Sequence, residues 1–321
     1  MFAVYAAEPN PQDPLMSLRV GDRPDPDVPD GTVAVTVVAA SLNMHDLWTL
    51  RGVGIKPDEF PMILGCDGAG VLADGTEVVI YPVVTSPGWI GDETVDPRRT
   101  LLTEKLPGTF AETVVVPARN VVPKPASLTF PEAACMGTAW LTAYRMLFVK
   151  SGLRAGQTML VQGASGGVPT ALVQLGRAAG MRVWVTGRTQ RKRALAQSLG
   201  AHQAFETGAR LPERVDAVFE TVGKATWSHS AKSVKPGGII VCSGATSGDA
   251  ERAELQRLFF LQLRMVGSTM GTRDELRDLL SFLDITGVHP QIGAELPMSD
   301  AEQGFKAMLD GNTAGKIVFT R

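Results

Sequence analysis

The chain has few of the features that would place a protein outside the cell, in a membrane or on nucleic acid. Its three cysteines, Cys66, Cys135 and Cys242, are odd in number and scattered, so we expect no disulfide framework and a reducing, cytoplasmic setting. No apolar run reaches bilayer-spanning length, and the N-terminus lacks the basic start and apolar core of a signal peptide. A formal net charge of −2 predicts no attraction to nucleic acid or a membrane surface.

The chain does have the length and the apolar content for two domains with separate cores, with 321 residues of which 44 % are hydrophobic. Up to about residue 125 it is rich in proline, glycine and valine. Strand-like runs stand at 33–39, 78–84 and 113–116, between clusters of turn-forming residues. This pattern predicts an irregular, mostly-β domain.

From residue 131 onward the pattern changes to an alternation of helices and strands. The expected helices are 131–148, 169–179, 190–199, 225–234 and 250–262, and the expected strands are 158–162, 182–186, 216–220, 238–242 and 265–267. Apolar strands that alternate with helices predict an α/β fold with a parallel, doubly wound sheet. The last fifty or so residues add one expected helix, a second expected helix at 300–309 and a strand at 316–320.

A glycine-rich segment joins the first strand of this alternation to the next helix. It reads Ala164-x-Gly166-x-x-Pro169, against the usual G-x-G-x-x-G of dinucleotide sites. Backbone N–H groups and the helix dipole at such a turn favour a pyrophosphate, which makes Ala164, Ser165, Gly166, Gly167 and Val168 cofactor-binding candidates. An ordinary strand–helix turn is the alternative. Pro169 is tolerated in a first helical turn, although it removes one N–H donor.

The end of the next strand indicates which nicotinamide cofactor would bind. Gly187 and Arg188 stand where an NAD site usually carries Asp or Glu, and Lys192 follows within one helical turn. Guanidinium and ammonium groups attract a 2′-phosphate, so we expect NADPH. The alternative is a solvated basic helix start, although basic residues there oppose the helix dipole.

Several segments, in order along the whole chain, resemble the medium-chain dehydrogenase/reductase superfamily, specifically its zinc-independent, quinone oxidoreductase-like members. They are Ser41-Leu42-Asn43, Asp46, Arg51-Gly52, Leu64-Gly65-Cys66-Asp67-Gly68-Ala69-Gly70, Gly108-Thr109-Phe110-Ala111-Glu112, Leu141-Thr142-Ala143-Tyr144-Arg145, the glycine-rich turn, Lys235-Pro236-Gly237-Gly238, Gly267-Ser268-Thr269-Met270-Gly271 and Gly315-Lys316-Ile317-Val318.

The resemblance implies a GroES-like catalytic domain formed by residues 1–122 and 268–321, with a Rossmann NADP-binding domain at 123–267. It also implies an active site in the cleft between the two domains. A homodimer joined through the Rossmann sheets is the assembly it implies.

Zinc-dependent relatives need a cysteine and a histidine at the catalytic metal, and catalytic zinc keeps one open position. At the two corresponding positions this chain has Asn43 and Cys66, and the stretch 86–107 contains no cysteine for a structural zinc. We therefore expect no metal, and we interpret Cys66 as a small buried hydrophobe.

Without a Lewis acid, nothing strong would stabilise an alkoxide, whereas hydrogen bonds can stabilise the enolate or hydroquinone oxygen of a conjugated acceptor. The expected reaction is hydride transfer from NADPH to a quinone or an α,β-unsaturated carbonyl. An enoyl-thioester reductase is the first alternative. A non-catalytic NADPH-binding or redox-sensing protein is the second, and a zinc alcohol dehydrogenase is the third.

Three residues are candidates for catalysis. Asn43 could donate an amide N–H to a carbonyl oxygen, or it could cap a helix or turn. His45 could act as general acid, or it could be a surface or structural histidine. The hydroxyl of Tyr144 could be a donor, or its ring could simply pack in the core.

The resemblance suggests further contacts. Trp48 would line the substrate pocket, the alternative being the core, and Asp46 would cap a short helix at 47–50. Thr138 would approach the nicotinamide. Ser243, Gly244 and Ala245 follow a Rossmann strand, so their backbone could meet the cofactor. Lys316 would reach back to the cofactor, unless it is merely a solvated lysine.

Overall fold

The computed structural model describes residues 1–312 and 314–321 and divides into two compact units. The first unit contains Met1–Leu141 and Met270–Arg321, and the second contains Thr142–Thr269. The segment 123–141, which the sequence analysis places in the Rossmann domain, groups with the first unit. Within the described part of the chain, no helix is long and apolar enough to cross a membrane.

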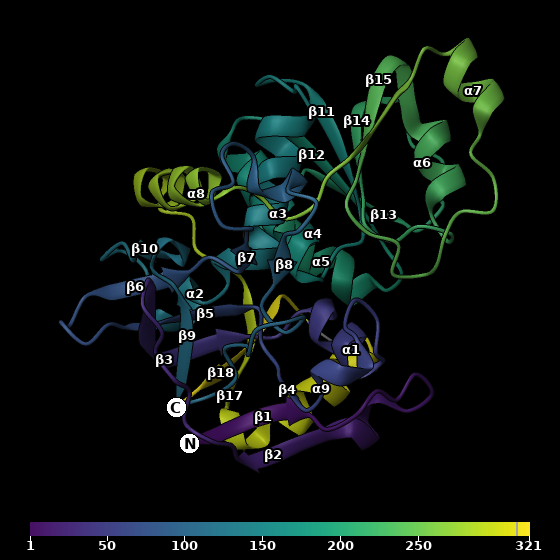
Figure 1. Ribbon diagram of the computed structural model, residues 1–321. Helices are drawn as coiled ribbons and strands as arrows, with labels where there is room; N and C mark the ends of the chain where they lie inside the picture. Colours follow the sequence, from purple (N-terminus) through teal and green to yellow (C-terminus); the bar gives the residue numbers. More distant parts are fainter. Residues whose placement is uncertain (313) are drawn as a thin grey trace. The chain divides into compact units, whose positions relative to one another are not determined.

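The first unit is built mainly of antiparallel strands (Figure 1, purple to blue and yellow). Its larger sheet has the order β10-β6-β5-β3-β18-β17, with β9 also paired to β3, and a smaller sheet has the order β2-β1-β4. The strands are β1 (Phe2–Ala6), β2 (Leu18–Asp22), β3 (Thr32–Ser41), β4 (Met62–Ile63), β5 (Asp67–Val71), β6 (Glu77–Ile80), β7 (Val83–Val84), β8 (Thr100–Leu101), β9 (Thr113–Pro117), β10 (Val121–Pro123), β17 (Ile292–Pro297) and β18 (Lys316–Thr320); the helices are α1 (Met44–Leu50), α2 (Phe130–Ala133), α8 (Arg273–Thr286) and α9 (Ala301–Leu309).

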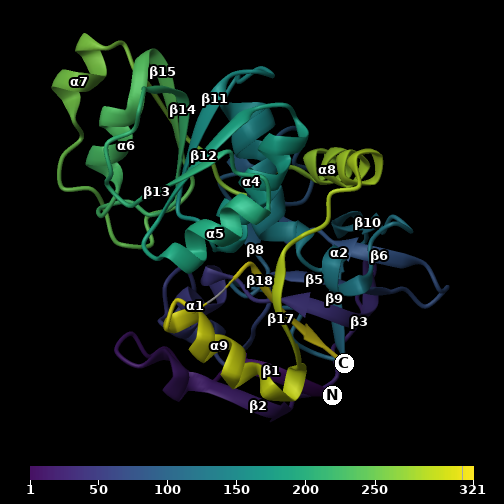
Figure 2. The same cartoon turned by 180° about the vertical axis from the view of Figure 1, so that it is seen from behind.

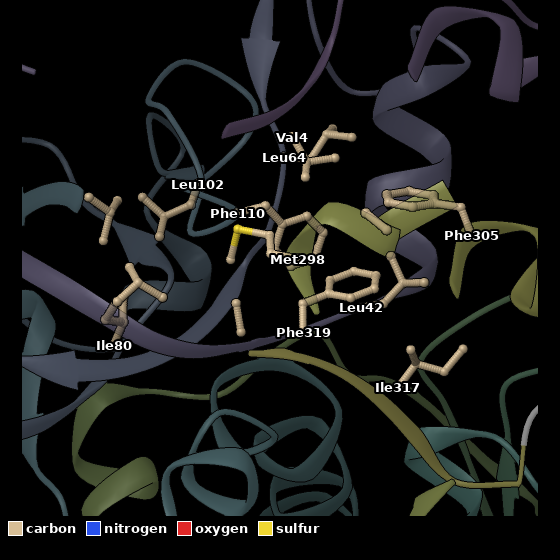
Figure 3. Packing of buried hydrophobic residues seen from close by; sticks show 14 of the residues in the cluster. Val4, Leu42, Leu64, Ile80, Leu102, Phe110, Met298, Phe305, Ile317 and Phe319 are labelled. Carbon is tan, nitrogen blue, oxygen red and sulfur yellow. The ribbon is translucent and has the colours of Figure 1, made fainter. Parts of the chain in front are cut away.

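The core of this unit ties the C-terminal tail to the N-terminal strands. Phe319 of β18 and Phe305 of α9 both meet Phe110, with ring centroids 5.0 and 6.3 Å away in edge-to-face geometry, which is favourable for aromatic pairs. Figure 3 shows these rings with Leu42 and Met298 around them. Because three large aromatic side chains from distant segments share one core, the tail belongs to the first unit.

The second unit is a six-stranded parallel sheet of order β13-β12-β11-β14-β15-β16. Its elements are β11 (Thr158–Gln162), α4 (Gly167–Ala178), β12 (Arg182–Gly187), α5 (Gln190–Ser198), β13 (Gln203–Glu206), β14 (Val215–Glu220), α6 (Trp227–Ser233), β15 (Val234–Cys242), α7 (Leu255–Phe260) and β16 (Arg264–Gly267), and α3 (Leu141–Tyr144) spans the boundary between the units. Figures 1 and 2 show α4 and α5 on one side of this sheet and α6 with α7 on the other.

The strand order reverses between β11 and β14, where one half of the sheet runs toward β13 and the other toward β16. Open α/β sheets bind ligands at the carboxyl ends of the strands beside such a reversal. The predicted α/β fold class, with a mostly-β part and a doubly wound parallel sheet, is confirmed.

Three of the expected elements are wrong in detail. The helix expected at 131–148 is interrupted by π-helical turns at Met136–Trp140 and Arg145–Lys150. The strand expected at 78–84 splits into β6 and β7. The helix expected at 250–262 begins only at Leu255, because Glu254 before it has φ of 54° and is left-handed.

Candidate functional site

The glycine-rich turn lies between β11 and α4, as the sequence predicts. Gly163 has φ of +93°, a conformation that L side chains rarely adopt. Gly166 precedes α4 as an extended N-cap residue, and no side chain caps the helix. The N–H groups of the first turn are therefore available to an anion. Pro169 is the third helical residue and is buried, so the helix forms with one donor fewer, as expected.

The turn and the end of β12 approach each other closely. A Cβ added to Gly187 would lie 3.0 Å from the Cβ of Ala164 and 3.1 Å from Cγ of Arg193. A side chain at residue 187 would therefore push these neighbours apart. The two segments approach closely at Gly187, so a Cβ there would require its neighbours to shift by a few tenths of an ångström. This approach brings the predicted cofactor residues of the turn and of β12 together.

A cluster of cations follows the end of β12. Arg188 is exposed and has no ion pair within the described ranges 1–312 and 314–321. The pKa of Lys192 is lowered by burial and then by the positive charges of Arg188 and Arg191. Arg193 is engaged separately, with the Gly187 carbonyl at 2.8 Å and Glu206 at 3.4 Å. The first turn of α5 contains no acidic residue, so this cluster favours a bound anion.

A buried polar network, which the sequence analysis missed, holds the carboxyl ends of three strands together. Thr186 donates to Gln162 Oε1 at 2.5 Å, and Gln162 Nε2 donates to Ser230 Oγ at 2.9 Å. Ser230 in turn donates to Glu220 Oε2 at 2.6 Å, and the backbone N–H groups of residues 222 and 223 donate to Glu220 Oε1. The only sequence signal was one polar residue ending each of three apolar strands.

The remaining predicted residues of the second unit lie near other strand ends. Ser243, just after β15, donates its hydroxyl to the sulfur of Met146 at 3.0 Å. A Cβ at Gly244 would lie 3.1 Å from the Thr221 carbonyl oxygen, so the backbone through Ala245 runs close to the residue after β14. The ring of Tyr144 packs on Phe148 with centroids 4.7 Å apart. This contact fits the core-packing alternative and leaves the donor role a prediction.

In the first unit, three polar side chains meet in a buried cluster. Asp67 begins β5, Lys316 begins β18, and Asn43 is the N-cap residue of α1. Lys316 Nζ donates to Asn43 Oδ1 at 2.6 Å, to the Leu42 carbonyl at 2.9 Å and to Asp67 Oδ2 at 3.3 Å. Asn43 Nδ2 donates to Asp67 Oδ2 at 2.8 Å and to the Ser41 carbonyl at 3.1 Å. Lys316 is 3 % exposed, so the solvated-lysine alternative is wrong.

This geometry limits what Asn43 and Lys316 can do. Both N–H groups of the Asn43 amide already face protein acceptors, so donation to a substrate carbonyl would break one of these bonds. Asn43 is the N-cap residue of α1, although its side chain bonds elsewhere. A cofactor contact by Lys316 would compete with three acceptors of its own unit.

Asp46 links the first turn of α1 to the segment before β5. Its two carboxylate oxygens accept from the backbone N–H groups of Asn43 and Gly65, both at 2.8 Å. Burial raises its pKa to about 7, and those two hydrogen bonds oppose the rise. The prediction that Asp46 caps a helix at 47–50 is wrong in position. α1 begins at Met44 with Asn43 as its N-cap residue, and Asp46 accepts from the Asn43 backbone N–H from inside the first turn.

His45 and Trp48 lie on α1, and both are partly buried. His45 Nε2 is buried without a hydrogen-bond partner among the described residues. Burial lowers the pKa of His45, although Glu104 and Asp67 act in the opposite direction. Thr138 lies in the first π-helical segment, and its hydroxyl is also buried without a described partner. Both atoms therefore have hydrogen-bonding capacity that no described residue uses.

The donor set around Cys66 does not fit a zinc ion. The Cys66 thiol is buried, donates to the Leu102 carbonyl at 3.2 Å, and has its pKa raised well above the ordinary value by burial. The cation that Asn43 contacts is an ammonium group. Over the residues that the structure describes, no three His, Cys, Asp or Glu side chains are grouped as metal ligands, whereas zinc requires such a set.

The lobe between β7 and α2 is organised by carboxylates. Asp96 Oδ2 accepts from Ser86 N and Oγ at 2.7 and 2.8 Å, and Asp96 Oδ1 accepts from Arg98 N at 2.8 Å. Burial opposes ionisation of Asp96, but these hydrogen bonds lower its pKa. Glu93 pairs with Arg119 at 2.9 Å. Side-chain acceptors thus hold a segment that contains no cysteine.

Comparison with known proteins gives the family. One family model, described as "Alcohol dehydrogenase GroES-like domain", matches residues 29–126, and another, described as "Zinc-binding dehydrogenase", matches residues 167–284. The chain is 26 % identical to acryloyl-coenzyme A reductase of Sulfurisphaera tokodaii, over 95 % of this chain and 97 % of that protein. It is 25 % identical to quinone oxidoreductase of Mus musculus, over 89 % and 88 %.

Among solved structures, a crystal structure of an NAD-dependent alcohol dehydrogenase is similar over 100 % of both chains, with a TM-score of 0.92 and 31 % identity. The two family models occur in the order that the two-domain arrangement requires, and the expected GroES-like part is confirmed. The relatives are named as oxidoreductases. This chain therefore belongs to the medium-chain dehydrogenase/reductase superfamily of oxidoreductases.

Proposed function

We propose that the protein is a zinc-independent oxidoreductase that transfers hydride from NADPH to a quinone or to an α,β-unsaturated carbonyl. The observation that carries the proposal is the cation cluster of Arg188, Arg191 and Lys192 beside the glycine-rich turn. Burial and then the like charges of Arg188 and Arg191 lower the pKa of Lys192, so a bound phosphate would relieve repulsion as well as form hydrogen bonds.

The proposed cofactor site uses two parts of the second unit. The uncapped first turn of α4, at Gly167 and Val168, would bind the pyrophosphate, and Arg188 with Lys192 would bind the 2′-phosphate. NADPH would supply the hydride. The alcohol dehydrogenase structure named above is described as NAD-dependent. We assign NADPH to this chain because β12 ends at Gly187 and Arg188 without a carboxylate to bind a ribose 2′-hydroxyl.

Zinc independence rests on the chemistry of the donor set. The Cys66 thiol donates to the Leu102 carbonyl at 3.2 Å, and the described part of the chain groups no three His, Cys, Asp or Glu side chains as metal ligands. Lys316 directs its ammonium at Asn43, which electrostatically disfavours a second cation there. An alkoxide would then lack a Lewis acid, so we favour an acceptor that is already conjugated.

The named relatives support the acceptor class from two directions. One is a quinone oxidoreductase, and the other is a reductase of acryloyl-coenzyme A, whose double bond is conjugated to a thioester. Both acceptors place negative charge on an oxygen after hydride addition. The proposal therefore covers quinones and enones first, with enoyl thioesters as the second candidate.

The test is an assay of purified protein for loss of NADPH absorbance with four acceptors: a small quinone, a simple enone, crotonyl-coenzyme A and an aldehyde. We expect turnover with the quinone or the enone and much slower turnover with the aldehyde. Preference for crotonyl-coenzyme A would select the enoyl-thioester alternative. Tight NADPH binding without oxidation by any acceptor would select the non-catalytic alternative. Zinc bound stoichiometrically and required for activity would overturn the proposal.

We further propose a homodimer formed through the second unit. β16 is an edge strand of the parallel sheet, and edge strands are ready to pair with another chain. On neighbouring α7, Leu255, Phe259 and Phe260 are 64, 71 and 79 % exposed. A cluster of large exposed apolar side chains is typical of an interface.

A further inference from the structure

The buried cluster around Lys316 joins four segments of the first unit. Ser41 ends β3, Asp67 begins β5 and Lys316 begins β18, while Asn43 immediately precedes α1. The sheet register sets Ser41 opposite both Asp67 and Val318. The cluster therefore lies where three neighbouring strands meet the N-terminus of a single helix.

All three N–H donors of the Lys316 ammonium have acceptors inside this cluster. A lysine ammonium has three N–H donors, and three acceptors lie within reach: the Leu42 carbonyl, Asn43 Oδ1 and Asp67 Oδ2. Lysine is almost never fully buried unless its charge is paired, and here the pairing carboxylate is itself completely buried. The ammonium thus serves the protein's own structure.

Asp67 is held in one orientation. Its Oδ2 accepts from Ser41 Oγ at 2.9 Å as well as from Asn43 and Lys316. Its Oδ1 has no partner in the described part of the chain and faces the first π-helical segment, where a Cβ on Gly137 would lie only 2.9 Å away. The Asp67 carboxylate is therefore packed between the strands and the first π-helical segment.

The side-chain amide of Asn43 has its direction fixed by these two charges. Its oxygen faces the ammonium of Lys316 and its nitrogen faces the carboxylate of Asp67. A flipped amide would place N–H groups against the ammonium and an oxygen against the carboxylate. Because Asn43 starts α1, this fixed amide also fixes where the helix begins.

We propose that Lys316 is a positioning residue: with Asp67 it locks Asn43 and so fixes the first turn of α1, the helix that carries His45 and Trp48. The kinetic part of this inference rests on the proposed function, whereas the structural part does not. The role differs from the direct cofactor contact expected for Lys316, because its ammonium contacts Asn43, Asp67 and the Leu42 carbonyl.

The test compares Lys316→Met, the double variant Lys316→Met/Asp67→Asn and a matched control, Lys306→Met, with the wild type. Lys306 is an exposed lysine of α9 paired with Asp310. Hydrogen exchange is measured by mass spectrometry on the peptide covering residues 41–50 of the full chain. We expect exchange in that peptide to be at least about tenfold faster in Lys316→Met and unchanged in Lys306→Met.

The double variant distinguishes two effects of Lys316→Met: loss of the contact that positions Asn43, and the cost of leaving the Asp67 charge buried without a partner. Removing the carboxylate together with the ammonium leaves no buried charge unpaired, so thermal stability should largely return. Asn43 Oδ1 still lacks the ammonium donor and no charge fixes the direction of its amide, so exchange in the α1 peptide should stay fast. Exchange at the wild-type rate in the double variant, once stability has returned, would overturn the inference.

Kinetics give a second readout. We expect Lys316→Met to lower kcat by about tenfold or more, while KM for NADPH changes less than about twofold, because the glycine-rich turn, Arg188 and Lys192 lie in the other unit. An unchanged kcat would also overturn the inference. A wild type that oxidises no NADPH would defeat the proposed function, and the exchange data would still decide the role of Lys316.

A further variant covers the case in which Lys316→Met does not fold. Gly137→Ala keeps every charged group but places a methyl group against Asp67 Oδ1. If the cluster positions α1, this change should also speed exchange in the peptide 41–50. If Gly137→Ala folds and leaves that exchange unchanged, the inference is wrong.

Discussion

At the residue scale, substitutions of charged side chains should have the largest effects. These side chains lie in the cation cluster after β12 and among the buried carboxylates of the first unit. Arg188 and Lys192 are neighbouring cations after the end of β12. Among the described residues, Arg188 has no carboxylate partner. Asp46 and Asp67, by contrast, are completely buried. Exposed charges affect ligand binding, whereas buried charges affect stability, so the two places call for different measurements.

The first prediction concerns Arg188→Ala. We expect KM for NADPH to rise by about 10- to 100-fold, since a hydrogen bond to a charged group contributes about 1.5–3 kcal/mol. KM for NADH should change little, because NADH has no 2′-phosphate. Steady-state kinetics with both cofactors measure this difference, and Arg277→Ala, an exposed arginine of the first unit, is the control. Equal effects on both cofactors would contradict the NADPH assignment.

The second prediction concerns Asp46 and pH. Because burial raises the pKa of Asp46 to about 7, the folded protein binds a proton that the unfolded chain releases near pH 4. The contribution of this group to stability is therefore present at low pH and is lost as pH rises toward 7. Asp46→Asn should flatten that part of the pH dependence.

The same substitution should also lower the free energy of unfolding at every pH, by about 1–3 kcal/mol. An asparagine would turn an N–H group toward one of the two backbone donors that Asp46 accepts from. Urea unfolding at pH 5 and pH 7.5 measures both effects, with exposed Asp278→Asn as the control. An unaltered pH slope would show that Asp46 does not titrate in this range.

At the scale of elements, helix termini and π-helical turns carry the function-related features. α4 begins without a side-chain cap, which leaves its first N–H groups to a ligand. The segment expected as one helix at 131–148 contains two π-helical stretches, and Gly137 and Thr138 lie in the first. π-Turns inside helices are frequent at functional sites, and here one of them packs against Asp67.

The third prediction concerns Pro169→Ala at the start of α4. Alanine would restore a backbone N–H in the first turn, so we expect NADPH to bind about 3- to 10-fold more tightly. Isothermal calorimetry measures the affinity. Pro131→Ala, in the first turn of α2, is the matched control and should have no effect. Weaker or equal binding in Pro169→Ala would mean that the third helical position does not face the phosphates.

At the scale of the whole molecule, two facts stand out. The C-terminal tail completes the core of the first unit through Phe305 and Phe319. The second unit leaves the edge strand β16 and the apolar side chains of α7 uncovered. The core of the first unit is complete within one chain, whereas the apolar side chains of α7 in the second unit are exposed. Such an exposed apolar face is suited to self-association.

The fourth prediction follows from that face. Phe260→Lys should convert the proposed dimer to a monomer, because a charge would be buried in the interface without a partner. Size-exclusion chromatography with light scattering measures the mass. Ile285→Lys, at a side chain of α8 that is 83 % exposed, is the control and should leave the mass unchanged. A wild type that is already monomeric would contradict the dimer.

The sequence by itself determined the features that depend on local pattern. The alternation of apolar strands with helices, the turn at Gly163–Gly167 and the missing carboxylate at the end of β12 are all short-range signals, and β11 and β18 begin and end at the expected residues. Short or half-exposed strands such as β13 escaped notice, because a few residues give too little periodicity to detect.

Only the tertiary structure decided which polar residues meet. Lys316 and Asp67 are 249 positions apart, and Gln162 and Ser230 are 68 apart. Such pairs arise from sheet order and register, which no local pattern encodes. The same residue types could have been solvated, as Lys316 could have been from its sequence context alone. Their burial and mutual hydrogen bonds, fixed by the packing of distant strands, are what give them a role.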